Sequence, residues 1–385
     1  MNTRLPLWPL CLATTAAGMA MISLGPLLDA ILRDLGAARA LGGVLSLAFF
    51  GGMCLAIAAV NFILGAFSSR ATLMLGATLQ GLGMVLAGGL AGRLGALAWS
   101  LAVIGFGYGL LTIYPGMIVT SLIKPAAERP LSIINGFFAV GVLATPLAIG
   151  QALAFGISWR GVFLGEGIIS FGLLPLLLKA PLPDMPGRQN IRFRQIAEIW
   201  RHNPRLLILI LLALWLYVGA ENIFNVWLAK FQIDTFASSA SRAGLTVSLF
   251  WLGLTIGRFG MVRLLARVPP HRIVFAAACF MAGGVAVVAL APWRLVSEAA
   301  CLATGLAASV IFPLVAGYAG RFPRWYAGVV FSLGYLAASG GSMLFPYLVG
   351  PAADWCGFRL AMLLAAAPSI AVALLAVPLR RSADA

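Results

Sequence analysis

Twelve long apolar runs follow one another along this chain of 385 residues. They lie at residues 8–30, 41–65, 71–91, 96–121, 132–156, 160–180, 204–229, 240–266, 272–291, 294–318, 325–352 and 358–379. Runs of about 18 or more apolar residues cross a bilayer as helices, because lipid offers backbone polar groups no partner outside the helix. With 62% hydrophobic and 10% charged residues, the chain has too few charges to cover soluble domains. We therefore expect an all-α membrane protein with twelve transmembrane helices.

A spacing of glycine and proline occurs twice in the chain, 200 residues apart. The first copy is Gly141, Pro146 and Gly150, and the second is Gly341, Pro346 and Gly350. Glycine and proline determine where helices bend and how closely they pack, so a repeated pattern indicates repeated geometry. The repeat predicts two pseudo-symmetric six-helix bundles with a site between them.

Two further echoes keep nearly the same offset. Gly107, Tyr114 and Pro115 are matched by Gly305, Phe312 and Pro313, and Trp159, Arg160 and Gly161 are matched by Trp355, Cys356 and Gly357. These echoes predict paired bends in the fourth and tenth spans, and in the fifth and eleventh.

The segment 181–203 separates the two predicted bundles, which occupy 1–180 and 204–385. Its first part is rich in proline, as linkers are. Phe193, Ile196 and Ile199 then follow at helical spacing among charged residues. This pattern predicts a linker that ends in a short amphipathic helix on the inner membrane surface.

Basic residues give the chain a net charge of +15 and predict its orientation. With both termini inside, 18 of the 26 basic residues fall in cytoplasmic segments, as the positive-inside rule requires. We therefore expect a multi-pass protein of a bacterial-type inner membrane with both termini cytoplasmic. The basic residues are scattered through short loops without aromatic interleaving, which argues against a nucleic-acid partner.

Residues typical of enzyme and metal sites do not cluster in the sequence. The five cysteines are far apart, the two histidines lie in predicted inner loops, and no nucleophile elbow or Walker loop occurs. We therefore expect no enzymatic activity, no metal and no cofactor. Transport by facilitated diffusion or by coupling to an ion gradient remains.

Two six-helix halves joined by a basic inner loop resemble the major facilitator superfamily over the whole chain. The loop signature of that family, G-x-x-x-D-R-x-G-R, is matched by Gly65 and Arg70, with Ser69 in place of the acid. A looser second copy contains Gly257 and Arg258. The resemblance implies that Gly65, Arg70 and Arg258 form a conformational latch.

Several strings also resemble the fucose–proton symporter branch of that family and its distant relatives. They are YVGAE at 217–221, FWLGLTIGR at 250–258, NGFFAVG at 135–141 and IFP at 311–313. That branch carries acids in its first and fourth spans. Here the fourth span has none and the first has only Asp29, near its outer end. The resemblance implies a secondary transporter that works by alternating access.

Glu221 is the acid that the sequence places deepest in the membrane. A charged carboxylate there costs several kcal/mol unless it is paired, hydrated or protonated, so such acids commonly mark proton or ion pathways. Tyr217 and Asn225 lie one turn to either side, as hydrogen-bonding partners on the same face. We expect Glu221 to be the proton or cation coupling residue. The alternative is a carboxylate that only ties its helix to a neighbour.

The other acids favour structural roles. Glu166 lies nearly two turns inside the sixth span, where a structural pairing is expected. Asp29 and Asp34 are expected to form a solvated outer rim, and Asp354 to lie at the membrane interface.

Neutral polar and aromatic residues offer the rest of a binding site. Rings beside hydroxyls and amides suit a neutral polar ligand, although the same residues also serve helix packing. The candidate substrate-binding residues are Tyr108, Thr112, Asn135, Tyr217, Asn222, Asn225, Trp251 and Tyr335. No arginine or lysine lies in the middle of a predicted span, which argues against organic anions.

These patterns favour a monomer in the lipid bilayer that imports a small molecule together with protons, with a sugar or polyol as the first candidate. Two alternatives stay open. One is an exporter of drug-like, cationic or siderophore-type compounds, and the other is a non-transporting receptor with the same fold.

Overall fold

The computed structural model describes residues 6–62, 67–89, 92–122, 128–183, 193–265 and 267–384. Every regular element in these residues is helical, which confirms the all-α prediction. The chain divides into two compact units, the first made of 1–36 and 48–190 and the second of 37–47 and 191–385. The start of one helix, α2, therefore belongs to the second unit, while its remainder belongs to the first.

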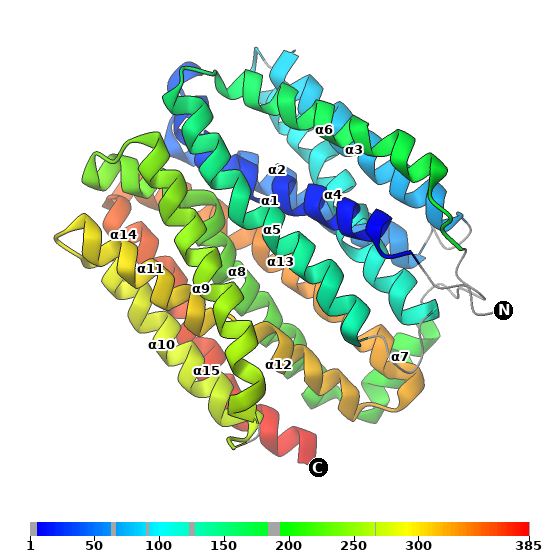
Figure 1. Ribbon diagram of the computed structural model, residues 1–385. Coiled ribbons are helices and arrows are strands. Elements are labelled where there is room, and N and C mark those ends of the chain that lie inside the picture. The colour runs from blue at the N-terminus through cyan, green and yellow to red at the C-terminus, as the bar shows by residue number, and fades with distance from the viewer. Residues whose placement is uncertain are drawn as a thin grey trace. The chain divides into compact units, whose positions relative to one another are not determined.

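The first unit is a bundle of six helices (Figure 1). They are α1 (Trp8–Asp34), α2 (Arg39–Phe62), α3 (Ser69–Gly89), α4 (Leu94–Leu122), α5 (Glu128–Ala154) and α6 (Trp159–Lys179). Within this unit α1 packs along α5, and α3 packs between α4 and α6.

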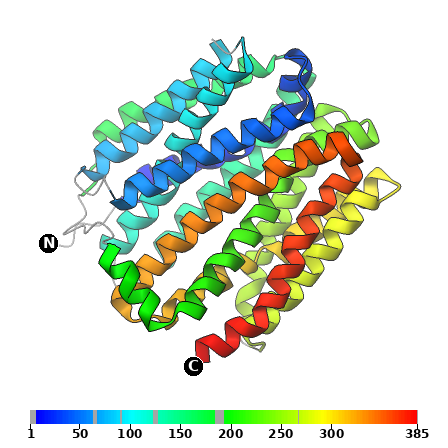
Figure 2. The same ribbon diagram turned by 180° about the vertical axis from the view of Figure 1, so that it is seen from behind.

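From residue 191 onward, the second unit consists of the short helix α7 followed by a series of long and short helices (Figure 2). They are α7 (Phe193–His202), α8 (Pro204–Phe236), α9 (Ala240–Leu265), α10 (Pro270–Leu290), α11 (Arg294–Ala308), α12 (Ile311–Gly317), α13 (Arg324–Cys356), α14 (Phe358–Met362) and α15 (Ala366–Asp384), with 3-10 turns at Tyr318–Arg321 and Leu363–Ala365. Here α8 packs along α13, α9 along α11, and α10 along α15.

Eleven stretches of the described chain are long and apolar enough to cross a membrane. The predicted tenth span is one of them, although α11, α12 and a 3-10 turn divide it. The predicted eighth span is α9, which has 26 residues. The chain is therefore a multi-pass membrane protein consistent with twelve spans.

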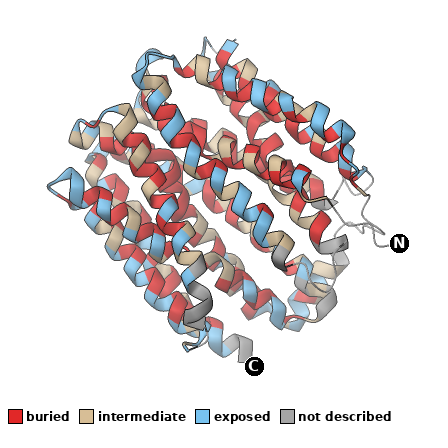
Figure 3. Cartoon of the chain, in the orientation of Figure 1, coloured by how far each residue is buried: buried red, intermediate tan, exposed pale blue. Residues whose placement is uncertain are grey.

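Exposed positions occur along the helices of both bundles (Figure 3), and many of them carry large apolar side chains. Phe155, Ile168 and Phe280 are among the most exposed. An exposed apolar surface of this kind needs an apolar environment, which lipid supplies.

The glycines of the repeat hold equivalent helix crossings. A Cβ added at Gly141 of α5 would lie 2.3 Å from the carbonyl oxygen of Thr15 in α1. A Cβ at Gly341 of α13 would lie 2.0 Å from the carbonyl oxygen of Trp215 in α8. Only glycine allows these backbones to approach so closely, so the repeated sequence marks repeated packing.

The predicted match of Gly107 with Gly305 has a different register in the structure. A Cβ at Gly105 would lie 1.9 Å from the Phe49 carbonyl oxygen, and one at Gly305 would lie 1.9 Å from that of Phe250. Gly105, rather than Gly107, is thus the counterpart of Gly305, and the offset is again 200 residues. A Cβ at Gly107 would instead meet the backbone of Gln80.

The predicted pairing of bends is also incomplete. Pro115 lies inside a continuous α4, whereas α11 ends at Ala308 and α12, which contains Pro313, begins at Ile311. The second copy is therefore broken where the first is not, and this break lies beside the site described below.

The amphipathic segment forms the expected helix, α7. Ile199 is fully buried, whereas Trp200 is exposed. The Tyr326 hydroxyl of α13 donates to a carboxylate oxygen of Glu198 at 2.8 Å, which helps to hold α7 on the second unit.

Candidate functional site

Glu221 and Tyr217 lie one turn apart on α8 and are both buried, with exposures of 7% and 1%. The Tyr217 hydroxyl is hydrogen-bonded to Oε2 of Glu221. The same hydroxyl lies 2.9 Å from the carbonyl oxygen of Ala308, the last residue of α11. The last carbonyls of a helix lack intrahelical donors, so the break after Ala308 leaves this oxygen open to a side chain. The Tyr217–Glu221 pairing predicted from the spacing is present.

Asn225, the other predicted partner of Glu221, points elsewhere. Its Nδ2 donates to Oδ1 of Asn222 at 2.7 Å, and its Oδ1 accepts from Nε1 of Trp251 at 2.9 Å. Nδ2 of Asn222 in turn donates to Oγ of Ser342 at 3.0 Å. This buried chain of hydrogen bonds joins α9, α8 and α13 through three of the predicted site residues. The polar groups of these residues bond to one another and so hold the helices together. Helix packing is the alternative role that the sequence indicates for such residues.

Arg258 lies within α9, seven residues before its end at Leu265, or about 10 Å along the axis. Its charge acts on Glu221, Tyr217 and Tyr335. Within the described part of the chain it makes no hydrogen bond or ion pair. The sequence assigned Arg258 to a cytoplasmic segment and to the latch. The structure places Arg258 within α9, where its charge reaches the candidate site.

Tyr335 of α13 completes the surroundings of this site in the second unit. Its ring packs edge-on against Phe312 at 5.3 Å and Phe331 at 5.2 Å between centroids. The break between α11 and α12 thus has a carboxyl, a guanidinium and two phenols near it.

The predicted substrate-binding residues of the first unit are more dispersed than those of the second. Tyr108 is buried and stacks on Phe49 with 5.4 Å between ring centroids. Thr112 lies one turn further along α4, and its buried hydroxyl oxygen has no partner among the described residues. Asn135 is exposed on α5. Tyr108 and Thr112 are therefore buried within the first unit, whereas Asn135 lies at its surface.

The structure gives the predicted latch residues different surroundings. Gly65 falls outside the described residues. Nη2 of Arg70 donates to the carbonyl oxygen of Ala180 at 2.8 Å, which ties the start of α3 to the residue after α6 inside the first unit. A latch role for these residues stays a prediction.

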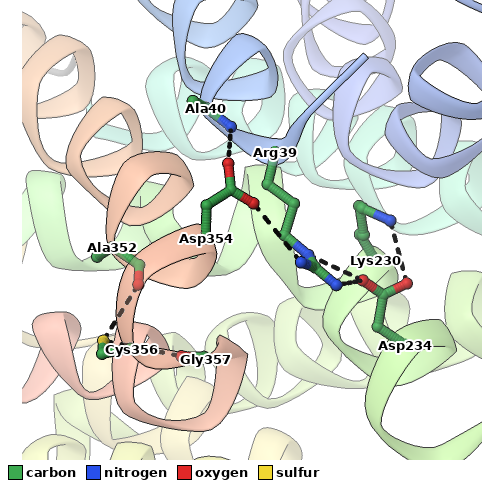
Figure 4. A network of polar contacts seen from close by, with 8 residues as sticks. All are labelled: Arg39, Ala40, Lys230, Asp234, Ala352, Asp354, Cys356 and Gly357. Atoms are coloured by element: carbon green, nitrogen blue, oxygen red, sulfur yellow. Dashed lines mark hydrogen bonds and ion pairs between the residues drawn. The ribbon is translucent and has the colours of Figure 1, made fainter. Parts of the chain in front are cut away.

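A second polar network, which the sequence did not predict, lies where α8 and α13 approach their C-terminal ends (Figure 4). Arg39, in the first turn of α2, donates to Asp234 from Nε and Nη2, at 3.1 and 2.9 Å. Its Nη1 lies 3.6 Å from Asp354, whose other oxygen accepts from the backbone N–H of Ala40 at 2.9 Å. Lys230 donates to the second oxygen of Asp234 at 3.0 Å.

Close backbone packing supports this network. A Cβ at Gly350 would lie 2.6 Å from the carbonyl oxygen of Arg39, and a Cβ at Gly43 would lie 2.6 Å from that of Tyr347. These contacts and the ion pairs explain why residues 37–47 group with the second unit. Asp354 was expected to be an interface residue. Arg39 and Asp234 are 195 residues apart, and no local spacing could connect them.

Two repeated helical units with eleven candidate spans and buried polar groups define a class, the multi-pass membrane proteins built from two copies of one bundle. The chain belongs to the Major Facilitator Superfamily, whose sequence profile matches residues 10–323.

Solved structures of membrane transporters share the fold. The nucleoside transporter NupG, in a mutant form, superposes with a TM-score of 0.81 at 14% identity and covers 97% of this chain and 99% of its own. A D-xylose–proton symporter gives 0.77 at 15% identity over 96% of both chains. The fucose–proton symporter FucP of E. coli, also a mutant, gives 0.66 at 19% identity over 98% of both chains.

Curated relatives match a smaller part. A TsgA homologue of Yersinia enterocolitica is 28% identical over 141 residues, which are 36% of this chain and 35% of that protein. A homologue from Yersinia pestis is 27% identical over the same length. The match spans about a third of the length of these relatives.

Proposed function

We propose that this protein is a proton-coupled transporter that imports a small neutral solute, such as a sugar or polyol, by alternating access. Glu221 is the proton-binding residue. The observation that carries this proposal is the contact pattern of the Tyr217 hydroxyl, which meets both Glu221 and the carbonyl oxygen of Ala308.

A phenol has one hydrogen and can donate it to only one of these two acceptors. If Tyr217 donates to Ala308, its contact with Glu221 needs a hydrogen from the carboxyl group. Both contacts are therefore satisfied when Glu221 is protonated and donates to Tyr217. When the proton leaves, Tyr217 can turn its hydrogen to the carboxylate, and the link to α11 beside the helix break is lost. Proton binding and the packing of α8 on α11 are thus coupled.

The positive charge of Arg258 opposes the effect of burial on the Glu221 carboxyl group. Burial removes the Glu221 carboxyl group from water, which opposes a charge there, whereas a nearby guanidinium can compensate that charge. A carboxyl held between these two effects can exchange its proton when its surroundings change, as a coupling residue must.

The solute class rests on the groups around this carboxyl. Tyr217 and Tyr335 offer aromatic surface with hydroxyl groups, which suits sugars and polyols. By their names, three of the structural neighbours transport nucleosides, D-xylose and fucose, all of which contain a sugar.

A second candidate is the import of an organic anion with protons, and Arg258 favours it. Once Glu221 is protonated, the charge of Arg258 has no neighbouring carboxylate and can attract an anion. The same cation disfavours the export of cationic compounds. A receptor without transport activity is the remaining alternative.

Uptake by proteoliposomes tests these choices. Sugars, polyols, nucleosides and organic anions are offered to the wild type and to Arg258→Gln, with and without an inward proton gradient. Gradient-driven accumulation of a neutral solute by the wild type, with exchange of that solute without a gradient retained in Arg258→Gln, supports the first candidate. Accumulation of anions that Arg258→Gln abolishes supports the second, and no movement of any solute contradicts transport.

We also infer a bacterial-type inner membrane with cytoplasmic termini, from the distribution of basic residues. In a variant whose five native cysteines are replaced by serine, a cysteine placed before Trp8 should resist a membrane-impermeant thiol reagent in intact cells and react after the cells are opened. Labelling in intact cells would reverse the orientation.

A further inference from the structure

A second acid is buried in the first unit and has no part in the function proposed above. Glu166 of α6 is only 6% exposed. Its Oε1 lies 2.6 Å from Oγ of Ser23 in α1, and that hydroxyl also lies 2.7 Å from the carbonyl oxygen of Met19. Both distances are typical of full-strength O–H···O hydrogen bonds.

The hydrogens available to these two contacts can be counted. Ser23 has one hydroxyl hydrogen, while a carbonyl oxygen and an ionised carboxylate have none. With Glu166 ionised, one of the two short contacts would join oxygens with no hydrogen between them. With Glu166 protonated, its O–H donates to Ser23, and the Ser23 O–H donates to Met19. Both contacts are then hydrogen bonds.

The charges on the neighbouring helices do not favour the ionised form. Among the residues that the structure describes, no cation contacts Glu166. Arg33 of α1 pairs with Asp29, and Arg160 of α6 pairs with Asp34 of α1. Arg70 of α3 binds the carbonyl oxygen of Ala180. Lys179 is exposed at the far end of α6. On α5, the side chains of Glu128 and Arg129 lie outside the described residues. An unpaired carboxylate at this burial would have lost its hydration without compensation.

The remaining oxygen of Glu166 fits the same interpretation. Oε2 is buried without a partner, and so is Oε1 of Gln80 in α3. The amide group of Gln80 does not donate to Glu166. Its Nε2 donates instead to Oγ of Ser170, one turn after Glu166, and to the carbonyl oxygen of Ala16, at 3.0 Å each. In a neutral acid, Oε2 is a carbonyl oxygen, whose lack of a partner is far less unfavourable than that of a charged oxygen.

We propose that Glu166 binds a proton, which gives the first unit a proton site of its own between α1 and α6. The bound proton forms the Glu166–Ser23 hydrogen bond that joins the two helices. Its loss leaves a buried charge at the joint, so the packing of α1 on α6 depends on protonation. This site is independent of Glu221 and of the transported solute.

Infrared spectroscopy of the purified protein tests this directly, because a protonated carboxyl has a C=O stretch separate from that of a carboxylate. At neutral pH the Glu166→Gln spectrum should lack one carboxylic-acid band that the wild type and Glu221→Gln both retain. Glutamine keeps the shape and neutrality of the protonated acid, so the folded yield should be unchanged. If no band is lost in Glu166→Gln, the proposal is wrong, whatever the uptake measurements show for Glu221.

Ser23→Ala provides a second test that keeps the carboxyl itself. Removal of the hydroxyl should shift the Glu166 band to higher frequency, because its O–H loses its acceptor. A spectrum identical to that of the wild type would exclude the protonated Glu166–Ser23 contact. Ser100→Ala is a matched control, since the Ser100 hydroxyl donates only to Ala96 of its own helix and the band should stay in place.

Discussion

Arg39, in the first turn of α2, binds Asp234 near the end of α8 with two hydrogen bonds from one guanidinium. Both residues belong to the second unit, so this ion pair holds the start of α2 on α8 within that unit. Two-point contacts between arginine and a carboxylate are more directional than those of lysine.

We expect Arg39→Gln to destabilise the protein by about 1 kcal/mol, at the upper end for partly exposed ion pairs, because two aspartates lose their shared partner. Thermal unfolding in detergent measures the change. Arg294→Gln is a control on an exposed arginine, 3.5 Å from Glu298, and should have a smaller effect. Equal effects of Arg39→Gln and Arg294→Gln would contradict the importance of the network.

The repeated glycines give a paired prediction. Gly141→Ala and Gly341→Ala should each lower stability by about 1–3 kcal/mol, because the added methyl group would meet a backbone carbonyl on the neighbouring helix. Gly136→Ala and Gly283→Ala are matched controls, since an added Cβ has nothing within 4 Å at either position. The unfolding temperatures of the four variants measure these changes in stability. Similar values for all four variants would show that the two crossings tolerate a wider separation.

The hydrogen-bond chain through Asn225 can be tested at one atom. Trp251→Phe keeps a large ring but removes the N–H that donates to Oδ1 of Asn225. A buried acceptor left without its donor costs about 1–3 kcal/mol, so unfolding should occur at a lower temperature. Solute affinity should change little if this chain serves packing. A large loss of affinity with unchanged stability would instead assign Trp251 to the binding site.

Local patterns in the sequence predicted much of this structure. Long apolar runs predicted the helices, because backbone groups in lipid must be satisfied within a helix. The i, i+4 spacing predicted the Tyr217–Glu221 contact, since one helical turn brings these side chains together. The repeat at Gly141 and Gly341 predicted two equivalent crossings.

The errors concern tertiary placement. Asn225 also lies one turn from Glu221, yet its amide bonds to Asn222 and Trp251, because a neighbouring helix offers a better partner. Arg258 was counted among the cytoplasmic basic residues, although the predicted run 240–266 contains it. The sequence alone did not show that its charge would reach Glu221 and Tyr217 on α8. The Arg39–Asp234 pair has no local signature at all. A sequence can show that a residue is polar and within a span, but its partner depends on which helices pack together.

The central claim is that proton binding at Glu221 drives solute accumulation. In proteoliposomes with an inward proton gradient and a solute identified from the uptake panel, Glu221→Gln should abolish accumulation above the outside concentration. Exchange of labelled for unlabelled solute without a gradient should continue, because glutamine mimics the protonated acid. Asp34→Asn, on the exposed Asp34, is the control and should accumulate solute as the wild type does. Undiminished gradient-driven accumulation by Glu221→Gln would contradict the claim.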